Sequence, residues 1–264
     1  MINPIALKIG PLSIHWYGIS YSIGILLSIW IVILLNKKRK IFKDSNQIFD
    51  LAFWIFMAGV ILGGRLGYVL FYNLPYYISN PAKIFAIWEG GMSFHGGLIA
   101  TALVIWIYCK KNKINFFAAG DMAVIPGALA LTFTRLANFV NRELVGRVIE
   151  NPNFKWMGVD FGDGVLRYPS QLFQSVSALL LFLILIFLYS KKFKHSKRLK
   201  NGVLVFGYVG LYGLFRFIEE FWRQPDAQVG FILRYFTLGQ LFSLLMLVIS
   251  FAGLFFIMRS GRKS

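Results

Sequence analysis

The chain has 264 residues, of which 57% are hydrophobic and only 15% are charged. A soluble domain averages about 45–50% apolar and about 25% charged residues, so this composition predicts an integral membrane protein. The net charge of +17 does not indicate nucleic-acid binding, because the basic residues stand in short blocks between apolar runs.

About 20 predominantly apolar residues cross the hydrocarbon core of a bilayer. The chain has seven such segments, and we expect one integral-membrane domain over 1–264. The first segment lacks the pattern of a signal peptide and is expected to remain as a span. The predicted spans are 17–35, 48–72, 94–109, 116–137, 170–190, 202–219 and 236–258, and those at 94–109 and 202–219 are the least clearly defined.

Alternate loops between these spans carry most of the lysine and arginine. Basic clusters follow the first, third, fifth and seventh spans, and the positive-inside rule makes these loops cytoplasmic. The N-terminus is then extracytoplasmic and the C-terminus cytoplasmic. The clusters are Lys37–Lys40, then Lys110, Lys111 and Lys113, then six residues within 191–200, then Arg259, Arg262 and Lys263.

The remaining loops, 73–93, 138–169 and 220–235, hold most of the acidic residues and are expected to face outward. The loop 138–169 is the longest, and its glycines, aspartates and Pro169 predict turns. We therefore expect a small extracytoplasmic cap on an all-α membrane protein. Asp121 lies at the opposite end, at the predicted cytoplasmic start of the fourth span, and is expected to be structural.

A polar group follows the apolar run that ends at Ala137. Arg135, Asn138 and Asn141 are spaced by three residues, so they share one face if the helix continues, and Glu143 and Gly146 follow. An arginine at the centre of a membrane helix costs about 2.5–3.5 kcal/mol on insertion scales. Ionisable residues within a membrane are functional candidates by default, so this group is the first candidate site.

Three further polar groups fall near predicted outer ends of spans. One is Ser93-Phe94-His95-Gly96-Gly97; another is Arg65 among Gly63, Gly64 and Gly67; the last is Tyr212, Arg216, Glu219 and Glu220. Each alone has a structural explanation. An Arg216–Glu220 pair is common in helices, the glycines suit close helix packing, and Tyr17 beside Trp16 is typical of an interfacial aromatic pair. Their convergence on one side of the membrane favours a site.

These residues resemble the bacterial prolipoprotein diacylglyceryl transferases. The similarity covers essentially the whole chain and rests on motifs in order. They are Trp16-Tyr17-Gly18, Gly64-Arg65-x-Gly67-Tyr68, Glu89-Gly-Gly-Met-Ser93-Phe-His95-Gly-Gly-Leu98, Arg135-x-x-Asn138-Phe-x-Asn141-x-Glu143-x-x-Gly146, and Tyr212-x-x-x-Arg216-x-x-Glu219-Glu220-x-x-Arg223-x-Pro225-Asp226.

The resemblance implies seven spans in the orientation predicted from charge, and transfer of a diacylglyceryl group from phosphatidylglycerol to a thiol. The acceptor would be the lipobox cysteine of a preprolipoprotein signal peptide, and glycerol 1-phosphate would be released. This is the first step of lipoprotein maturation. It implies a multi-pass protein of the bacterial cytoplasmic (inner) membrane, among membrane lipids, with its active site toward the extracytoplasmic leaflet. No cofactor, metal or nucleic acid is expected.

The site residues suit such a reaction. Arginine binds phosphate through a planar fork and keeps its charge, so Arg135 and Arg216 are expected to be catalytic. His95 is the candidate general base for the thiol, and an arginine-stabilised thiolate without a protein base is the alternative. The expected substrate-binding residues are Tyr17, Arg65, Asn138, Asn141, Glu143, Gly146, Tyr212 and Glu220, with Glu143 and Glu220 also holding the arginines in place.

Two other classes of protein also explain arginines inside a membrane. A transporter or flippase for an anionic lipid would need polar residues along the inner half of the spans, which is apolar here apart from Asp50 and Asp121. A non-enzymatic assembly or receptor protein would have no need for a histidine beside clustered arginines. The sequence therefore favours the enzyme.

Overall fold

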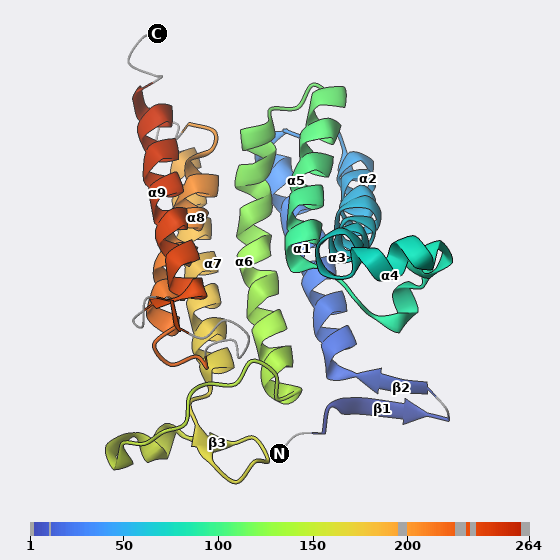
Figure 1. Ribbon diagram of the computed structural model, residues 1–264. Helices are drawn as coiled ribbons and strands as arrows, with labels where there is room; N and C mark the ends of the chain where they lie inside the picture. The colour runs from blue at the N-terminus through green and yellow to red at the C-terminus, as the bar shows by residue number, and fades with distance from the viewer. Residues whose placement is uncertain (1–2, 11, 195–199, 225–230, 233–235, 260–264) are drawn as a thin grey trace. The chain divides into compact units, whose positions relative to one another are not determined.

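The computed structural model describes residues 3–10, 12–194, 200–224, 231–232 and 236–259 (Figure 1). Within them the protein is all-α apart from three short β-hairpins. Part of the basic cluster 191–200, Arg262, Lys263 and the Pro225-Asp226 end of the last motif lie outside the described residues.

Helices occupy all seven predicted apolar segments, with bounds within a few residues of those expected. The elements are α1 (Trp16–Arg39), α2 (Ser45–Trp54) continued by η1 (Ile55–Gly63) and α3 (Gly64–Tyr72), α5 (Phe94–Lys111), α6 (Phe116–Val140), α7 (Ser170–Lys194), α8 (Val203–Glu219) and α9 (Leu238–Arg259).

Five of these segments are long and apolar enough to cross a membrane among the residues described: α1, Ser45–Tyr72, α6, Ser170–Ser190 of α7, and α9. The α5 and α8 helices do not reach this standard. A helix of 17 residues such as α8 is about 26 Å long at 1.5 Å per residue, slightly less than a hydrocarbon core of about 30 Å. The protein is therefore a multi-pass membrane protein with five clear spans.

Short elements fill the predicted outer loops. The loop after α3 holds α4 (Leu74–Ser79), η2 (Pro81–Phe85) and η3 (Ile87–Glu89). The loop after α6 holds η4 (Pro152–Met157), β3 (Val159–Asp160) and β4 (Leu166–Arg167), and the hairpin β5 (Phe231–Ile232) with β6 (Phe236–Thr237) precedes α9. The hairpin β1 (Ile5–Ile9) with β2 (Leu12–His15), which the sequence analysis does not predict, precedes α1.

The chain forms two compact units. The first, here called the α6–α9 unit, comprises Met1–Ile31 and Gly120–Ser264; the second, the α2–α5 unit, comprises Val32–Ala119. In the α6–α9 unit, α8 packs against α9 and α7, as Figure 1 shows. Ser250 of α9 donates to the Phe206 carbonyl at 2.7 Å, and Ser175 of α7 donates to the Thr132 carbonyl of α6 at 3.2 Å.

Glycines set the close packing in the α2–α5 unit, as the sequence predicts. An added Cβ on Gly67 of α3 would lie 2.6 Å from the Cα of Gly96 in α5, and one on Gly63 would lie 2.1 Å from the Ala100 side chain. Small residues allow membrane helices to approach in this way. The first turn of α5, which carries His95, is thereby held against α3.

Asp121 of α6 has the structural role that the sequence predicts. Its side chain is fully buried and accepts hydrogen bonds of 3.0 Å from the backbone N–H groups of Gly202, Leu204 and Val205. These are among the first N–H groups of α8, which have no partner within the helix. The negative charge also stabilises the positive end of the α8 dipole, so Asp121 fixes where α8 begins.

We expect Asp121→Ala to lower the free energy of unfolding by about 1–3 kcal/mol, because three buried N–H groups lose a charged acceptor. Thermal unfolding of the purified protein in detergent measures the change. Asp44→Ala is the matched control, because Asp44 caps α2 through a single hydrogen bond to Gln47 N–H in an exposed position. An equal loss in the two variants would contradict this role of Asp121.

Candidate functional site

The polar group at the end of α6 forms a continuous hydrogen-bonded chain. Arg135 Nη1 donates to Asn138 Oδ1 at 3.3 Å, and Asn138 Nδ2 donates to Glu143 Oε2 at 3.0 Å. Asn141 Nδ2 lies 3.5 Å from Glu143 Oε1. The helix continues to Val140 and thus places Arg135 and Asn138 on one face. Glu143 is connected to Arg135 through Asn138, an indirect form of the support predicted for it.

The turn that carries Glu143 is conformationally unusual. Arg142 and Leu144 on either side have φ of 60° and 55°, and non-glycine residues in this left-handed region cost about 1–3 kcal/mol each. The start of α7 holds the turn. Gln171 Nε2 donates to the Glu143 carbonyl at 2.6 Å, and Ser170 Oγ donates to the Leu144 carbonyl at 2.9 Å.

Gly146 lies where two other parts of the backbone approach it closely. Its N–H donates to the Tyr168 carbonyl at 3.1 Å, and it pairs as an isolated bridge with Arg223. An added Cβ would lie 2.2 Å from the Tyr168 oxygen and 2.7 Å from the Trp222 oxygen. The protein's own backbone thus approaches Gly146 closely, and the predicted contact of Gly146 with substrate stays a prediction.

We expect Gly146→Ala to lower both the unfolding temperature and the activity, because two backbone carbonyls would have to move apart. The effect should correspond to more than about 1 kcal/mol of stability. Gly207→Ala is the control, because nothing lies within 4 Å of its added Cβ and alanine is favoured in a helix. Unfolding curves in detergent compare the two, and an unchanged Gly146→Ala protein would contradict the close approach.

Arg216 on α8 is held by the next turn of its own helix. The structure confirms the predicted Arg216–Glu220 ion pair, through Nη2 and Oε1. Glu220 is buried, and its second oxygen accepts a hydrogen bond of 2.9 Å from Thr237 Oγ1. Arg223 Nη1 lies 3.5 Å from the same carboxylate. Glu220 therefore fixes the orientation of Arg216 and supplies its counter-charge.

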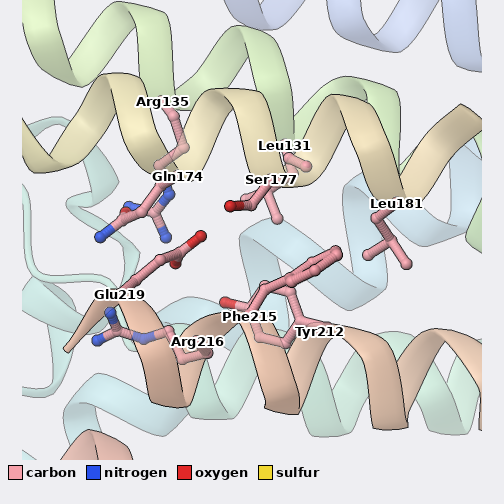
Figure 2. A pocket seen from close by; sticks show the side chains of 10 residues that line it. Leu131, Arg135, Gln174, Ser177, Leu181, Tyr212, Phe215, Arg216 and Glu219 are labelled. Atoms are coloured by element: carbon pink, nitrogen blue, oxygen red, sulfur yellow. The ribbon is translucent and has the colours of Figure 1, made fainter. Parts of the chain in front are cut away.

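A cleft among α6, α7 and α8 brings the two arginines together. Figure 2 shows Arg135 from α6 and Arg216 from α8 on either side, with Glu219 between them and Gln174 of α7 beside Arg135. The lining residues are Leu131, Arg135, Gln174, Ser177, Ala178, Leu181, Tyr212, Phe215, Arg216 and Glu219. Two positive charges at a cleft with apolar side chains in its lining suit an anionic group attached to an apolar chain.

Two tyrosines predicted as substrate contacts lie near Arg135 in this unit. Tyr212 lines the cleft and stacks on Tyr208 at a ring distance of 5.9 Å. Tyr17, at the start of α1, interacts electrostatically with Arg135 and Glu143, and its hydroxyl lies 3.1 Å from that of Tyr21. The α6–α9 unit thus brings together nine of the eleven predicted site residues.

Arg65 belongs to the α2–α5 unit and is buried there. All five of its N–H groups are directed to backbone carbonyls of the following loop, and its guanidinium lies 5.2 Å from the centre of the Tyr77 ring. The acceptors are the carbonyls of Lys83, Ile84, Ala86, Gly90 and Gly91. This places Arg65 in a structural role, and its predicted contact with substrate stays a prediction.

His95 is in the first turn of α5, in the same unit as Arg65. Ser93 caps this helix by accepting a hydrogen bond of 3.2 Å from the Gly96 N–H. The imidazole is exposed and makes an edge contact with the Phe94 ring at 5.8 Å. An exposed imidazole can exchange protons with a ligand.

Comparison with known proteins gives these motifs their context. A family model described as prolipoprotein diacylglyceryl transferase matches residues 4–256. The chain belongs to this family. A phosphatidylglycerol–prolipoprotein diacylglyceryl transferase of Ehrlichia ruminantium is 40% identical over 100% of this chain and 98% of its own length. Proteins of the same name from Desulfotalea psychrophila and Geobacter sulfurreducens are 43% and 42% identical, over 92% of this chain and 88% and 90% of their own lengths.

Several polar residues of this candidate site have no role predicted from the sequence. Gln171 holds the Glu143 turn, while Gln174, Ser177 and Glu219 line the cleft. The sequence feature that could have indicated the residues of α7 is the presence of glutamine and serine in the first turns of an otherwise apolar helix, 170–190. Glu219 is in the predicted polar group of α8, but its neighbour Glu220 has the spacing that pairs with Arg216.

Two ionisable pairs lie in loops of this family member and do not line the cleft. A hydrogen bond from Arg167 lowers the pKa of Asp163 at the β3–β4 hairpin, with Nε 2.7 Å from Oδ2. A hydrogen bond to Glu89 raises the pKa of Lys83 in the loop after α3. Both pairs are largely exposed, so we expect them to contribute little to stability.

Proposed function

We propose that this protein transfers the diacylglyceryl group of phosphatidylglycerol to the lipobox cysteine of a preprolipoprotein signal peptide. The observation that carries the proposal is the pairing of Arg135 and Arg216 at one cleft among apolar helices, in a chain of the prolipoprotein diacylglyceryl transferase family. The relatives act, by their names, on phosphatidylglycerol and a prolipoprotein.

The bond changes define what the site must do. The cysteine sulfur forms a bond to the terminal carbon of the diacylglyceryl group, and the bond from that carbon to a phosphate oxygen breaks. Glycerol 1-phosphate leaves, and the thiol proton passes to a base or to the departing phosphate. Negative charge grows on the phosphate as this bond breaks, and preorganised donors are most effective where charge develops.

Each arginine has a distinct support for this task. Arg216 is fixed by Glu220 through Nη2, which leaves Nη1 buried without a hydrogen-bond partner among the described residues. Arg135 is connected to Glu143 through Asn138. In this proposal both guanidinium groups bind the phosphodiester, and Asn138, Asn141, Tyr17 and Tyr212 orient the lipid headgroup. Arg65 holds the loop after α3, and Gly146 allows the close backbone approach of Tyr168 and Trp222; both are also proposed to contact substrate.

In this proposal His95 is the general base that removes the proton of the cysteine thiol. A free cysteine thiol has a pKa of about 8.5, and the thiolate is the nucleophile. An exposed imidazole at the start of α5 suits proton removal near neutral pH. The alternative is a thiolate stabilised by the arginines alone, with the proton passing to the phosphate product.

The proposed topology has seven spans, with α5 and α8 as the two shorter ones. Basic residues after α1, α5 and α9 support cytoplasmic positions for these ends. The N-terminus is then extracytoplasmic, the C-terminus is cytoplasmic, and the Arg135 end of α6 faces the outer leaflet of the cytoplasmic membrane. A reporter enzyme that is active only outside the cytoplasm tests this orientation when it is fused to each terminus in turn. We expect activity with the fusion to the N-terminus and none with the fusion to the C-terminus.

A direct assay tests the activity. The purified full-length protein is incubated with phosphatidylglycerol and a lipobox peptide, and the products are analysed by mass spectrometry. We expect the peptide to gain one diacylglyceryl group while glycerol phosphate is released in equal amount. A peptide with serine in place of the cysteine is the control. Absence of both products with a folded protein would contradict the proposal.

A further inference from the structure

The cleft between Arg135 and Arg216 contains polar atoms that phosphate binding by the two arginines does not explain. Gln174 is only 5% exposed, and its Nε2 donor has no hydrogen-bond partner among the residues that the structure describes. Arg216 Nη1 also has no partner there, and the proposed phosphate contact accounts for it. A buried donor without a partner costs about 1–3 kcal/mol. The Gln174 donor therefore indicates that the ligand supplies an acceptor in addition to those that bind the arginines.

Glu219 adds an acceptor to the same cleft. It is 8% exposed and is the one carboxylate among the described lining residues. Figure 2 shows its carboxylate directed into the space between Gln174 and Ser177. The Ser177 hydroxyl donates to the Phe173 carbonyl at 3.1 Å, and a carboxylate has about four lone-pair positions, so acceptor positions on Glu219 remain available to a ligand.

Glu219 is not needed to hold Arg216. Glu220 already forms the ion pair with Arg216 and is itself fixed by Thr237. A second buried carboxylate so close to the phosphate position would weaken anion binding by repulsion. Its presence is accounted for if the ligand brings hydroxyl donors as well as an anion.

We infer that Glu219 and Gln174 form a subsite that recognises the free glycerol of the phosphatidylglycerol headgroup. The Glu219 carboxylate accepts hydrogen bonds from the glycerol hydroxyls, and the Gln174 amide donates to a headgroup oxygen. This inference rests on the proposed function and adds that the leaving group is recognised through its hydroxyls as well as its phosphate. Glu219 is then a substrate-binding residue that determines headgroup specificity.

The appropriate probe is a lipid that differs from phosphatidylglycerol only in these hydroxyls. Phosphatidylpropanol has the same phosphodiester, charge and headgroup length but no hydroxyl group. Phosphatidylethanolamine is a poor probe, because its ammonium group would also be attracted to a carboxylate. A hydrogen bond to a charged group that is lost in this way lowers kcat/KM by about 10- to 100-fold.

The experiment measures kcat/KM of the full-length protein for both lipids with one lipobox peptide. We expect the wild-type protein to prefer phosphatidylglycerol by about 10- to 100-fold. Glu219→Gln should reduce this preference to a few-fold, mainly by raising KM for phosphatidylglycerol, while the rate with phosphatidylpropanol changes little. Glu219→Asp, which keeps the charge, should recover part of the preference.

Glu220→Gln is the matched variant on the adjacent residue. It loosens Arg216, so we expect it to reduce the rates with both lipids alike and to leave their ratio unchanged. If Glu219→Gln behaves in the same way, Glu219 is only a counter-charge and the inference is wrong. Equal rates with both lipids in the wild-type protein would also overturn it, even if no Glu219 variant folds. Failure to transfer from either lipid would instead contradict the proposed function.

Discussion

Replacement of Arg216 by alanine is expected to lower kcat/KM for phosphatidylglycerol by about 100- to 1,000-fold, the usual loss when one preorganised donor to a developing charge is removed. The guanidinium is oriented by Glu220 before any ligand binds, so no binding energy is needed to position it. Most of the loss should be in kcat, because the phosphate gains charge as its bond to carbon breaks.

The variant Arg216→Lys separates the contribution of the positive charge to activity from that of the planar guanidinium group. Lysine keeps the positive charge but lacks the planar fork that binds two phosphate oxygens, so we expect an intermediate activity. Arg167→Ala is the control, because Arg167 is paired with Asp163 in the outer loop and does not line the cleft. Its activity should stay within about twofold of the wild type. Full activity of Arg216→Ala in a folded protein would remove this arginine from the mechanism.

The helices of this protein follow from the apolar runs in its sequence. Each predicted span coincides with a helix, because about 20 consecutive apolar residues have one stable arrangement in lipid. The basic clusters at the ends of α1 and α5 were equally visible. The runs also mark the segments of α5 and α8 as the least clearly defined spans, and these two helices fall short of the length and hydropathy of the other five segments.

The structure of the outer loops could not be derived in the same way. The short helices α4, η2 and η3 have few residues each, and carbonyls within and after η2 and after η3 bind Arg65, which lies earlier in the sequence. Contacts of this kind depend on tertiary structure, and local sequence preferences do not report them. The same applies to Gly146, whose neighbours Tyr168 and Trp222 are distant in sequence.

The candidate site was partly predictable for a physical reason. Arginine in an apolar helix is costly enough to stand out, so Arg135 and Arg216 are recognisable without a structure. Gln174 and Ser177 are less costly and resemble ordinary polar residues near a helix end. Only the packing of α6, α7 and α8 reveals that they share a cleft with Glu219.

Replacement of His95 by glutamine is expected to reduce kcat by about 100- to 10,000-fold if the imidazole removes the thiol proton, the usual contribution of a general base. Glutamine keeps a polar side chain of similar length but does not titrate. The wild-type rate should rise with pH, because only the neutral imidazole can accept a proton. The His95→Gln profile should lose that step.

The two sources of the thiolate give different results in this experiment. If the arginines alone stabilise the thiolate, the wild type and His95→Gln should instead share one pH profile, because the imidazole then accepts no proton. A lipobox peptide with selenocysteine in place of cysteine extends the test, because a selenol is ionised at neutral pH and needs no base. Its reaction should be nearly insensitive to His95→Gln if His95 is the base. A large loss with the selenocysteine peptide would mean that His95 acts in binding or in positioning the lipid, and the proton would then pass to the phosphate product.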